Sequence, residues 1–388
     1  MDKPLQIAYI SADDPKDIGV WSGTHFSIFN SISKHLGNVD TLGPYSNKKI
    51  NFLLKLKKIF YKLILQKKYN VYHSKMLATN YGAYFNHLLS KKKYDLIVGV
   101  SASAELAYIK TKTPIVFISD AVFTNALNYS PTLSNLCKTS IEEGFETESK
   151  ALNNSSLLFV TSEWVKSNAI NDFKISENKI EIAPLGANLT DVLSEDDVLN
   201  FKKNKDNSIL NLIFVGVKWE SKGGQKAYDC LVSILKKGIR AKLTVVGCEI
   251  PKHIKNDALF NIPFIKKTTP EGRKQFEDLY LNADFIILPT KFEAFGIVFC
   301  EAAAYSVISI GNRTGGTSSA IKEGVNGYLM NPDQTGEDYA DKIISIYNDK
   351  PKFKELLISC RKRYNNELNW DSWGLHLKKA LKEKNIIS

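Results

Sequence analysis

The chain has 388 residues, which is too long for one ordinary hydrophobic core and predicts two domains. Apolar residues make up 44% of it and charged residues 24%, a balance typical of soluble globular proteins. No apolar run approaches the ~18 residues of a membrane-spanning helix, and the net charge of +11 suggests an anionic partner.

The first residues, MDKPLQIAYI, lack the basic leader and the long apolar region of a signal peptide. The five cysteines are far apart and odd in number. We therefore expect a cytoplasmic protein with neither a disulfide framework nor a zinc site.

The first half of the chain alternates short apolar runs with helical patterns. Helices are predicted at 25–36 and 139–153, and strands at 5–10, 39–42, 95–100, 114–119, 157–162 and 179–184. Several strands are continuous Val/Ile/Leu runs, which is typical of parallel sheets covered by helices on both faces. This alternation predicts an α/β domain.

A strongly amphipathic helix is predicted over 50–68, inside a segment, 41–94, that holds twelve lysines and no acidic residue. Its polar stripe contains Lys55, Lys58 and Lys62, and its wide opposite face contains Phe52, Leu53, Leu56, Ile59, Phe60, Leu63 and Ile64. We expect part of this apolar face to pack on the first sheet. The lysines indicate either a solvated surface or a docking face for an anionic membrane leaflet.

The polar segment 186–208 carries no strand pattern and is predicted to be the domain junction. Beyond it, helices are predicted at 224–237, 273–282 and 338–347, and strands at 210–216, 241–247, 284–289 and 306–311. The fold class is therefore α/β, with two doubly wound Rossmann-like domains. Such domains bind ligands at the carboxyl ends of their strands, so we expect a site in a central cleft.

Two glutamates, Glu293 and Glu301, stand eight residues apart in the apolar stretch KFEAFGIVFCEAAAYSVISI (291–310). A turn leaves the preceding strand and places four residues at the start of a helix: Ala294, Phe295, Gly296 and Ile297. Free backbone N–H groups at a helix start suit a phosphate, and a carboxylate can accept two sugar hydroxyls. The alternative is a surface helix with two solvated glutamates.

The stretch FVGVKWESKGGQKAYD (214–229) has a similar design, in which a strand is followed by Gly216, a lysine and a pair of glycines before a helix. An ammonium at Lys222, beside the free N–H groups of that helix, can hold a diphosphate. A third glycine turn, at 311–324, follows the strand at 306–311. Three phosphate-suited turns in one domain indicate a nucleotide-binding role; singly, each could be an ordinary loop.

These residues resemble glycosyltransferase family 4, the retaining glycosyl transferases group 1 with the GT-B fold. The likeness rests on Glu293 and Glu301 as an E-x7-E motif, on Lys222, and on the segment RTGGTSSAIKEGVNGYLMNPDQ; it is specific over about 208–347. The stretch WDSW (370–373) resembles the family's closing helix. The resemblance implies a Rossmann-like acceptor-binding domain at 1–188, a Rossmann-like nucleotide-sugar domain at 207–365, and a helix at 366–388 that returns to the first domain.

The resemblance also implies roles for the donor-binding residues. Lys222 and the backbone N–H groups of 295–297 would hold the donor diphosphate, Glu301 the ribose, and Glu293 the transferred sugar, with Ala294 also in the donor site. Residues 263–267, with Ile265 at their centre, would border the base. Where the family often has an arginine, this chain has Val217 after Gly216, so Lys218 is the expected substitute.

In the first domain the resemblance is looser. The loop that ends at Gly23 matches the family's glycine loop near the donor phosphates, and His25 after it could contact donor or acceptor, or simply pack. Where the family often has a histidine, Ser119 and Asp120 stand here, so Asp120 is the expected polar group on the acceptor side.

The expected function is metal-independent, retaining transfer of a hexose-type sugar from a nucleotide-diphosphate sugar to a membrane-associated glycolipid or surface-polysaccharide acceptor. No cofactor is expected, and the enzyme would be peripheral on the inner leaflet of the membrane, without a nucleic-acid partner. Two alternatives remain: a glycoside hydrolase that uses Glu293 and Glu301, and a non-catalytic basic protein that binds membranes or nucleic acid.

Overall fold

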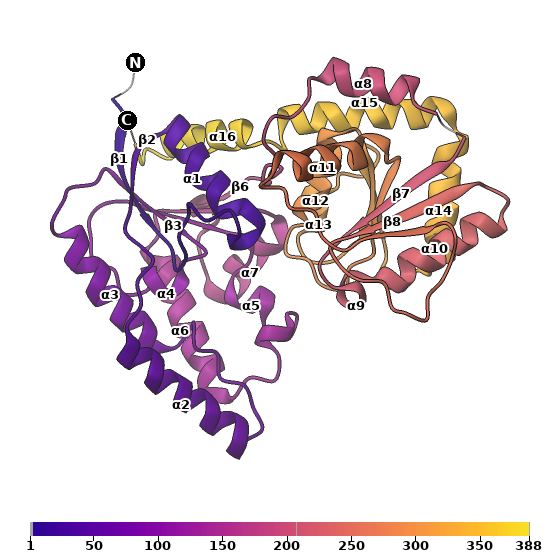
Figure 1. Ribbon diagram of the computed structural model, residues 1–388. Helices are drawn as coiled ribbons and strands as arrows, with labels where there is room; N and C mark the ends of the chain where they lie inside the picture. Colours follow the sequence, from indigo (N-terminus) through magenta and orange to yellow (C-terminus); the bar gives the residue numbers. More distant parts are fainter. Residues whose placement is uncertain (1–2, 207, 388) are drawn as a thin grey trace. The chain divides into compact units, whose positions relative to one another are not determined.

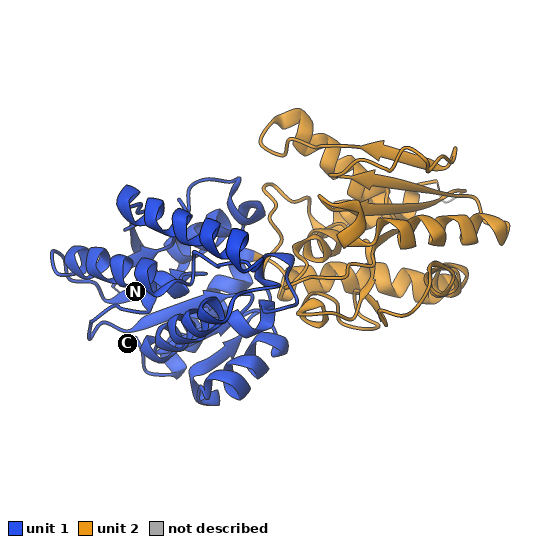
Figure 2. Ribbon diagram, turned by 90° about the horizontal axis from the view of Figure 1, so that it is seen from below, with its two compact units in different colours: residues 1–184, 370–388 blue, residues 185–369 orange. Residues whose placement is uncertain are grey.

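The computed structural model describes residues 3–206 and 208–387. The chain forms two compact units (Figure 2), one of residues 1–184 and 370–388 and the other of residues 185–369. Each unit contains one six-stranded sheet in which every strand pair is parallel. The predicted α/β class with two doubly wound sheets is thereby confirmed.

The first sheet follows the predicted strands closely. Its order is β2-β1-β3-β4-β5-β6, with β1 at Leu5–Ile10, β2 at Gly37–Thr41, β3 at Leu96–Val100, β4 at Ile115–Ser119, β5 at Leu157–Val160 and β6 at Ile180–Ile182. Every residue of β3, β4 and β5 is buried. Burial on both faces explains why these strands are continuous apolar runs.

Helices cover both faces of this sheet (Figure 1). Alternate side chains of β1 enter opposite cores: Ile7 and Tyr9 join one, and Ala8 and Ile10 the other. The first core is closed by α1 (Thr24–His35) and α16 (Trp370–Glu383). The second is covered by α2 (Lys48–Ile64), α3 (Lys75–Leu89), α4 (Ser103–Leu106), α5 (Phe123–Ala126), α6 (Lys138–Asn154) and α7 (Glu163–Phe173).

The C-terminal helix α16 returns to the first unit and packs along α1, as the resemblance implied. Trp373 is 2% exposed and meets Phe159 of β5 edge to face, with ring centroids 5.2 Å apart. The Ser31 hydroxyl donates to the Trp370 carbonyl at 2.6 Å, and Asp371 accepts from Lys34 at 2.6 Å. The first core is therefore completed by the last part of the chain.

The second sheet has the order β12-β11-β10-β7-β8-β9. Its strands are β7 at Leu210–Val215, β8 at Ala241–Val246, β9 at Leu259–Ile262, β10 at Phe285–Leu288, β11 at Ile308–Asn312 and β12 at Gly327–Met330. In chain order this is the 3-2-1-4-5-6 arrangement, whose direction reverses between β7 and β10. The two strands at this switch point lead into the two stretches that carry the predicted lysine and glutamates.

The helices of the second unit are α8 (Glu195–Asn204), α9 (Trp219–Lys222), α10 (Gly224–Lys236), α11 (Pro270–Asn282), α12 (Ile297–Ala304), α13 (Thr317–Ala320), α14 (Gly336–Asn348) and α15 (Lys350–Asn366). Helices α10 and α14 pack together, and α12 packs on α15 (Figure 1). Helix α8 occupies much of the segment predicted as a junction, and the Ser194 side chain caps its start by accepting from the Asp197 N–H.

The predicted packing of α2 is wrong. All seven residues of its apolar face are exposed, from 42% at Ile59 to 70% at Leu63. The helix instead rests on a narrow stripe on which Leu54 is 0% exposed and Ile50 and Tyr61 contact the second core. Lys57 also belongs to this stripe, and its Nζ donates to Glu143 of α6 at 3.0 Å. The sheet already has α3, α4 and α6 on this face, so the wide face of α2 stays uncovered.

Candidate functional site

The candidate site begins at the switch point of the second sheet. Ligands of open α/β sheets bind outside the carboxyl ends of the strands where the strand order reverses. Two turns leave that edge: 216–223 after β7 and 289–296 after β10. They are joined backbone to backbone, because the Lys291 N–H donates to the Ser221 carbonyl at 3.0 Å.

Gly223 allows the two turns to touch. Its φ of 79° lies in the left-handed region, and a Cβ on it would come within 2.1 Å of the Pro289 carbonyl oxygen. Any other residue would therefore push the two turns apart. The close approach brings Lys222, at the end of α9, next to Glu293.

Lys222 and Glu293 form an ion pair at this edge. The Lys222 Nζ lies 2.5 Å from the Glu293 Oε2, and the two side chains are 22% and 16% exposed. The stem of Lys222 passes over Gly216, where a Cβ would come within 3.0 Å of the Lys222 Cγ. The pair is thus partly desolvated and still reachable by a ligand.

The start of α12 lies directly after Glu293. Gly296 caps the helix with a φ of 96°, and Ile297 is its first residue. Phe295 is only 2% exposed, so its side chain belongs to the core, whereas Ala294 and Ile297 are half-buried. The first N–H groups of a helix have no partner within it, which makes this terminus suited to an anionic group.

Glu301 lies one turn further along α12 and is paired with Lys267. The Lys267 Nζ donates to the Glu301 Oε1 at 2.8 Å; the carboxylate is 3% exposed and the lysine 39%. No short-range spacing could have pointed to Lys267, because its partner is 34 residues away. The nearby Ile265 is buried and Phe264 is 74% exposed, and a role of this segment in contacting the base stays a prediction.

Lys218 has a different position from Lys222. It is exposed, and its carbonyl accepts the Lys222 N–H at 3.1 Å, so it starts the short helix α9. Val217 beside it is 75% exposed. A role of Lys218 in phosphate binding stays a prediction.

The candidate site residues of the first unit lie at the carboxyl edge of its sheet, but they follow different strands. Gly23, with a φ of 89°, and His25 follow β1, whereas Asp120 follows β4, and β3 lies between those strands. His25 is 4% exposed, and its Nδ1 lies 3.3 Å from the Tyr9 hydroxyl. Burial lowers the pKa of His25, against the smaller effect of Asp13. His25 is therefore packed and hydrogen-bonded, and Asp120 is half-buried.

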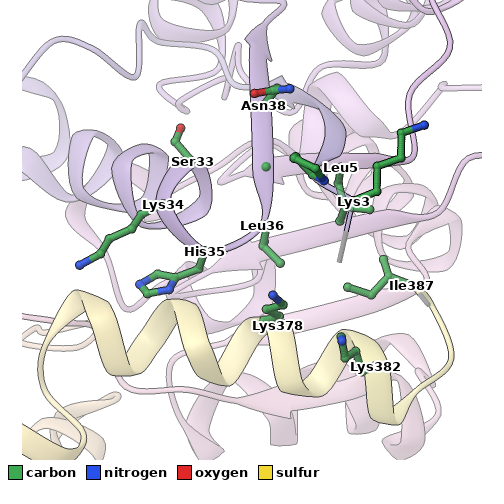
Figure 3. Close-up of a pocket in the computed structure, with 12 residues that line it drawn as sticks. Lys3, Leu5, Ser33, Lys34, His35, Leu36, Asn38, Lys378, Lys382 and Ile387 are labelled. Atoms are coloured by element: carbon green, nitrogen blue, oxygen red, sulfur yellow. The ribbon is translucent and has the colours of Figure 1, made fainter. Parts of the chain in front are cut away.

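Two pockets are lined by residues other than the predicted donor-binding ones. One of about 350 Å³ lies at the starts of β1 and β2 and is lined by basic side chains from Lys3, Lys34, His35, Lys378 and Lys382 (Figure 3). It is at the opposite edge of the first sheet from His25. The other, about 750 Å³, is in the second unit; it is lined by Trp219, Gly223, Pro289, Lys291 and further residues, but by none of the predicted donor-binding ones.

Part of the chain matches a known protein family. Residues 196–363 match the family described as "Glycosyl transferases group 1". The "Uncharacterized glycosyltransferase MJ1607" of Methanocaldococcus jannaschii is 25% identical over 228 residues, which cover 55% of this chain and 57% of that protein. The chain therefore spans little more than half the length of this curated relative.

Two solved structures resemble nearly the whole chain. The sucrose-phosphate synthase (tll1590) of Thermosynechococcus elongatus has a TM-score of 0.67 at 16% identity, over 99% of this chain and 100% of that one. Anabaena Alr3699/HepE, in complex with UDP and glucose, has a TM-score of 0.61 at 14% identity, over 98% and 100%. These likenesses confirm the GT-B fold that the sequence resemblance implied.

Proposed function

Because residues 196–363 match the glycosyl transferases group 1 family, we propose that the protein is a retaining glycosyltransferase that moves a hexose-type sugar from a nucleotide-diphosphate sugar to a membrane-associated acceptor. One observation carries the proposal: the Lys222–Glu293 pair and the start of α12 meet at the switch point of the second sheet. This edge offers a cation, free N–H groups and hydroxyl acceptors side by side.

The donor is bound by complementary groups. Its diphosphate accepts from the Lys222 ammonium and from the N–H groups at the start of α12. Glu293, beside that ammonium, accepts hydroxyls of the transferred sugar. Glu301, deeper on α12, accepts the two ribose hydroxyls.

The reaction breaks the bond between the anomeric carbon and the diphosphate oxygen. The bonding electrons leave with the nucleoside diphosphate, so negative charge grows on the phosphate next to Lys222. A fixed ammonium and fixed N–H donors stabilise that charge without having to reorient. The acceptor hydroxyl attacks the anomeric carbon from the face that the phosphate leaves, and its proton passes to that phosphate. Attack from this face retains the anomeric configuration.

A glycoside hydrolase is less well supported. Such an enzyme needs two carboxyl groups facing one glycosidic bond, and one of them must hold a proton. Here Glu293 is ion-paired with Lys222, and Glu301, which is 3% exposed, is ion-paired with Lys267. Lysine-paired carboxylates suit the acceptance of hydroxyls rather than proton donation.

Helix α2 favours a membrane-associated acceptor. Its seven-residue apolar face is exposed, as is the lysine stripe of Lys55, Lys58 and Lys62 beside it. Seven exposed apolar side chains on one helix are hard to reconcile with a merely solvated surface. The apolar face would insert into the surface of an anionic leaflet, and each lysine near that surface would contribute about 1 kcal/mol of electrostatic attraction.

Nucleic acid suits this surface poorly, because its affinity comes from phosphate contacts and aromatic stacking. Five of the seven exposed apolar side chains of α2 are aliphatic. No helix in the described ranges 3–206 and 208–387 is long and apolar enough to cross a membrane. We propose that the first unit docks peripherally on the inner leaflet.

A donor screen tests the proposed function. Purified protein is incubated with nucleotide sugars of several bases and hexoses, with and without lipid extract, and release of nucleoside diphosphate is measured. The proposal expects release that depends on one donor and rises with lipid extract. Release of free sugar at the same rate without acceptor would favour the hydrolase, and no release with any donor would contradict enzymatic transfer.

A further inference from the structure

Lys267 forms a contact that the proposed roles do not include. It lies in the turn between β9 and α11, and its ammonium reaches the Glu301 Oε1 at 2.8 Å. The same Nζ lies 4.8 Å from the ring centroid of Phe276 on α11. Two elements therefore fix the ammonium, one through a charge-assisted hydrogen bond and the other through a cation–π contact.

Glu301 needs such a partner. Its carboxylate is only 3% exposed, and a buried carboxylate is costly unless it is paired and hydrogen-bonded. Lys267 is 39% exposed, so its ammonium remains partly hydrated while it meets the buried oxygen. The pair costs less desolvation than one buried on both sides.

The turn that carries Lys267 is itself held in shape. The Lys267 N–H donates to the Ile265 carbonyl at 3.1 Å, and the Thr269 N–H donates to the Lys266 carbonyl at 3.1 Å. The Thr269 side chain also caps α11 by accepting from the Gly272 N–H. The position of the ammonium is thus set by the backbone as well as by its partners.

We propose that Lys267 is a positioning residue for nucleotide binding, which holds the Glu301 carboxylate in the orientation that accepts the ribose hydroxyls. This inference rests on the proposed function, since it needs a ribose at Glu301. When the ribose binds, Glu301 accepts its hydroxyls while one carboxylate oxygen keeps its bond to Lys267. The lysine acts on the ribose through Glu301.

The test compares two ligands by calorimetry: UDP, or whichever of GDP and ADP binds the wild type best, and its 2′,3′-dideoxy form. We expect Lys267→Met to weaken binding of the ribonucleotide roughly tenfold or more, and to leave affinity for the dideoxy form within about twofold. A merely structural defect would weaken both. Lys267→Arg should restore most of the loss. Lys274→Met serves as the matched control, because Lys274 also pairs with a carboxylate, Asp278, but is 65% exposed and lies outside the segment predicted to border the base.

A double-mutant cycle completes the test, because contacting residues are coupled and independent ones are additive. In a Glu301→Gln background, Lys267→Met should add less than a twofold loss. A full additional loss, an equal loss for the dideoxy nucleotide, or an unchanged affinity of Lys267→Met would each overturn the role of Lys267 and leave the proposed function standing. A wild type that binds none of the diphosphates would overturn both.

Discussion

Lys222 is placed for its proposed task by its surroundings rather than by its own flexibility. Its stem lies over Gly216, its ammonium is bonded to Glu293, and Gly223 locks the following turn onto Pro289. An ammonium held in this way is already in position when charge develops on a leaving phosphate. Its contribution should therefore appear in the rate and scarcely in the stability.

We predict that Lys222→Ala lowers turnover of the donor by about 100- to 1000-fold, the usual cost of losing one such donor. The unfolding midpoint should stay close to that of the wild type, because the pair is partly exposed. Nucleoside diphosphate release gives the rate, and Lys236→Ala, on the exposed end of α10, is the control. Turnover near the wild-type rate would mean that another cation holds the phosphate.

Glu105 offers a prediction on pH. This residue of α4 is 0% exposed, and the Tyr72 hydroxyl donates to its Oε2 at 2.9 Å. Burial raises the pKa of Glu105 from 4.5 to about 7, against the smaller opposing effect of the Tyr72 bond. The folded state therefore holds the proton more tightly than the unfolded state, and stability is lost as the pH rises from about 4.5 to about 7.

Glu105→Gln removes this dependence, because an amide needs no proton to be neutral. We predict that the variant exceeds the wild type in unfolding free energy by about 3 kcal/mol at pH 8, and that the gain shrinks steadily toward pH 5. Urea unfolding at a series of pH values measures it. A difference that is constant across this range would show that the carboxyl is ionised in the folded state.

At the scale of elements, the strands were predictable where they are buried on both faces. The runs that became β3, β4 and β5 are wholly apolar and wholly buried. Strand β9 was not predicted, because it is a sheet edge with no fully buried residue. Strand β12, GYLM, is another edge strand and has only four residues. Runs of four residues are too short to show the periodicity by which strands are recognised in a sequence.

Helix α2 shows the other limit of sequence reasoning. Its amphipathic pattern was visible, but the pattern could not tell which face the rest of the unit would cover. The stripe of Ile50, Leu54 and Tyr61 packs against the second core. Two hydrogen bonds to α6 hold it there, from Lys57 to Glu143 and from Tyr61 to Thr139. Those partners are more than 70 residues away in the chain.

We predict that the protein co-sediments with anionic liposomes at low salt and much less at high salt, because the surface charges are then screened. Changing Lys55, Lys58 and Lys62 to glutamate should abolish binding. The same change at Lys350, Lys354 and Lys362 of α15 alters the net charge equally and should leave most of it. An equal loss in both triple variants would attribute binding to net charge, and no binding by the wild type would point to an acceptor free in solution.

Helix α16 gives a stability prediction for the first unit. Trp373 is 2% exposed and fills the core beside Phe159. Trp373→Ala should lower the unfolding free energy by roughly 3–5 kcal/mol, the usual cost of deleting a buried aromatic side chain. Urea unfolding measures the loss, with Leu375→Ala, at a 56% exposed position of the same helix, as the control. Similar small losses in both variants would mean that α16 is not part of the core.

At the scale of the whole molecule, the sequence led to the fold class and to the residues that now meet at the switch point. The E-x7-E spacing and the glycine turns are local signals, and both glutamates and Lys222 lie at the predicted edge. The pairing of Lys267 with Glu301 and the uncovered face of α2 could not be predicted, because each depends on long-range packing. The sequence could not decide between Asp120 and His25 as the polar group on the acceptor side. The two residues follow strands that are not neighbours, so they do not form one cluster by strand order alone.

The most direct test of the central claim is the fate of the sugar in one reaction. The protein is incubated with its preferred donor, lipid acceptor and excess EDTA, and NMR reports how much sugar is transferred and with which anomeric configuration. The account predicts a glycosylated acceptor with the configuration of the donor, formed at the same rate with and without EDTA. An inverted product, free sugar as the main product, or activity lost with the chelator would contradict it.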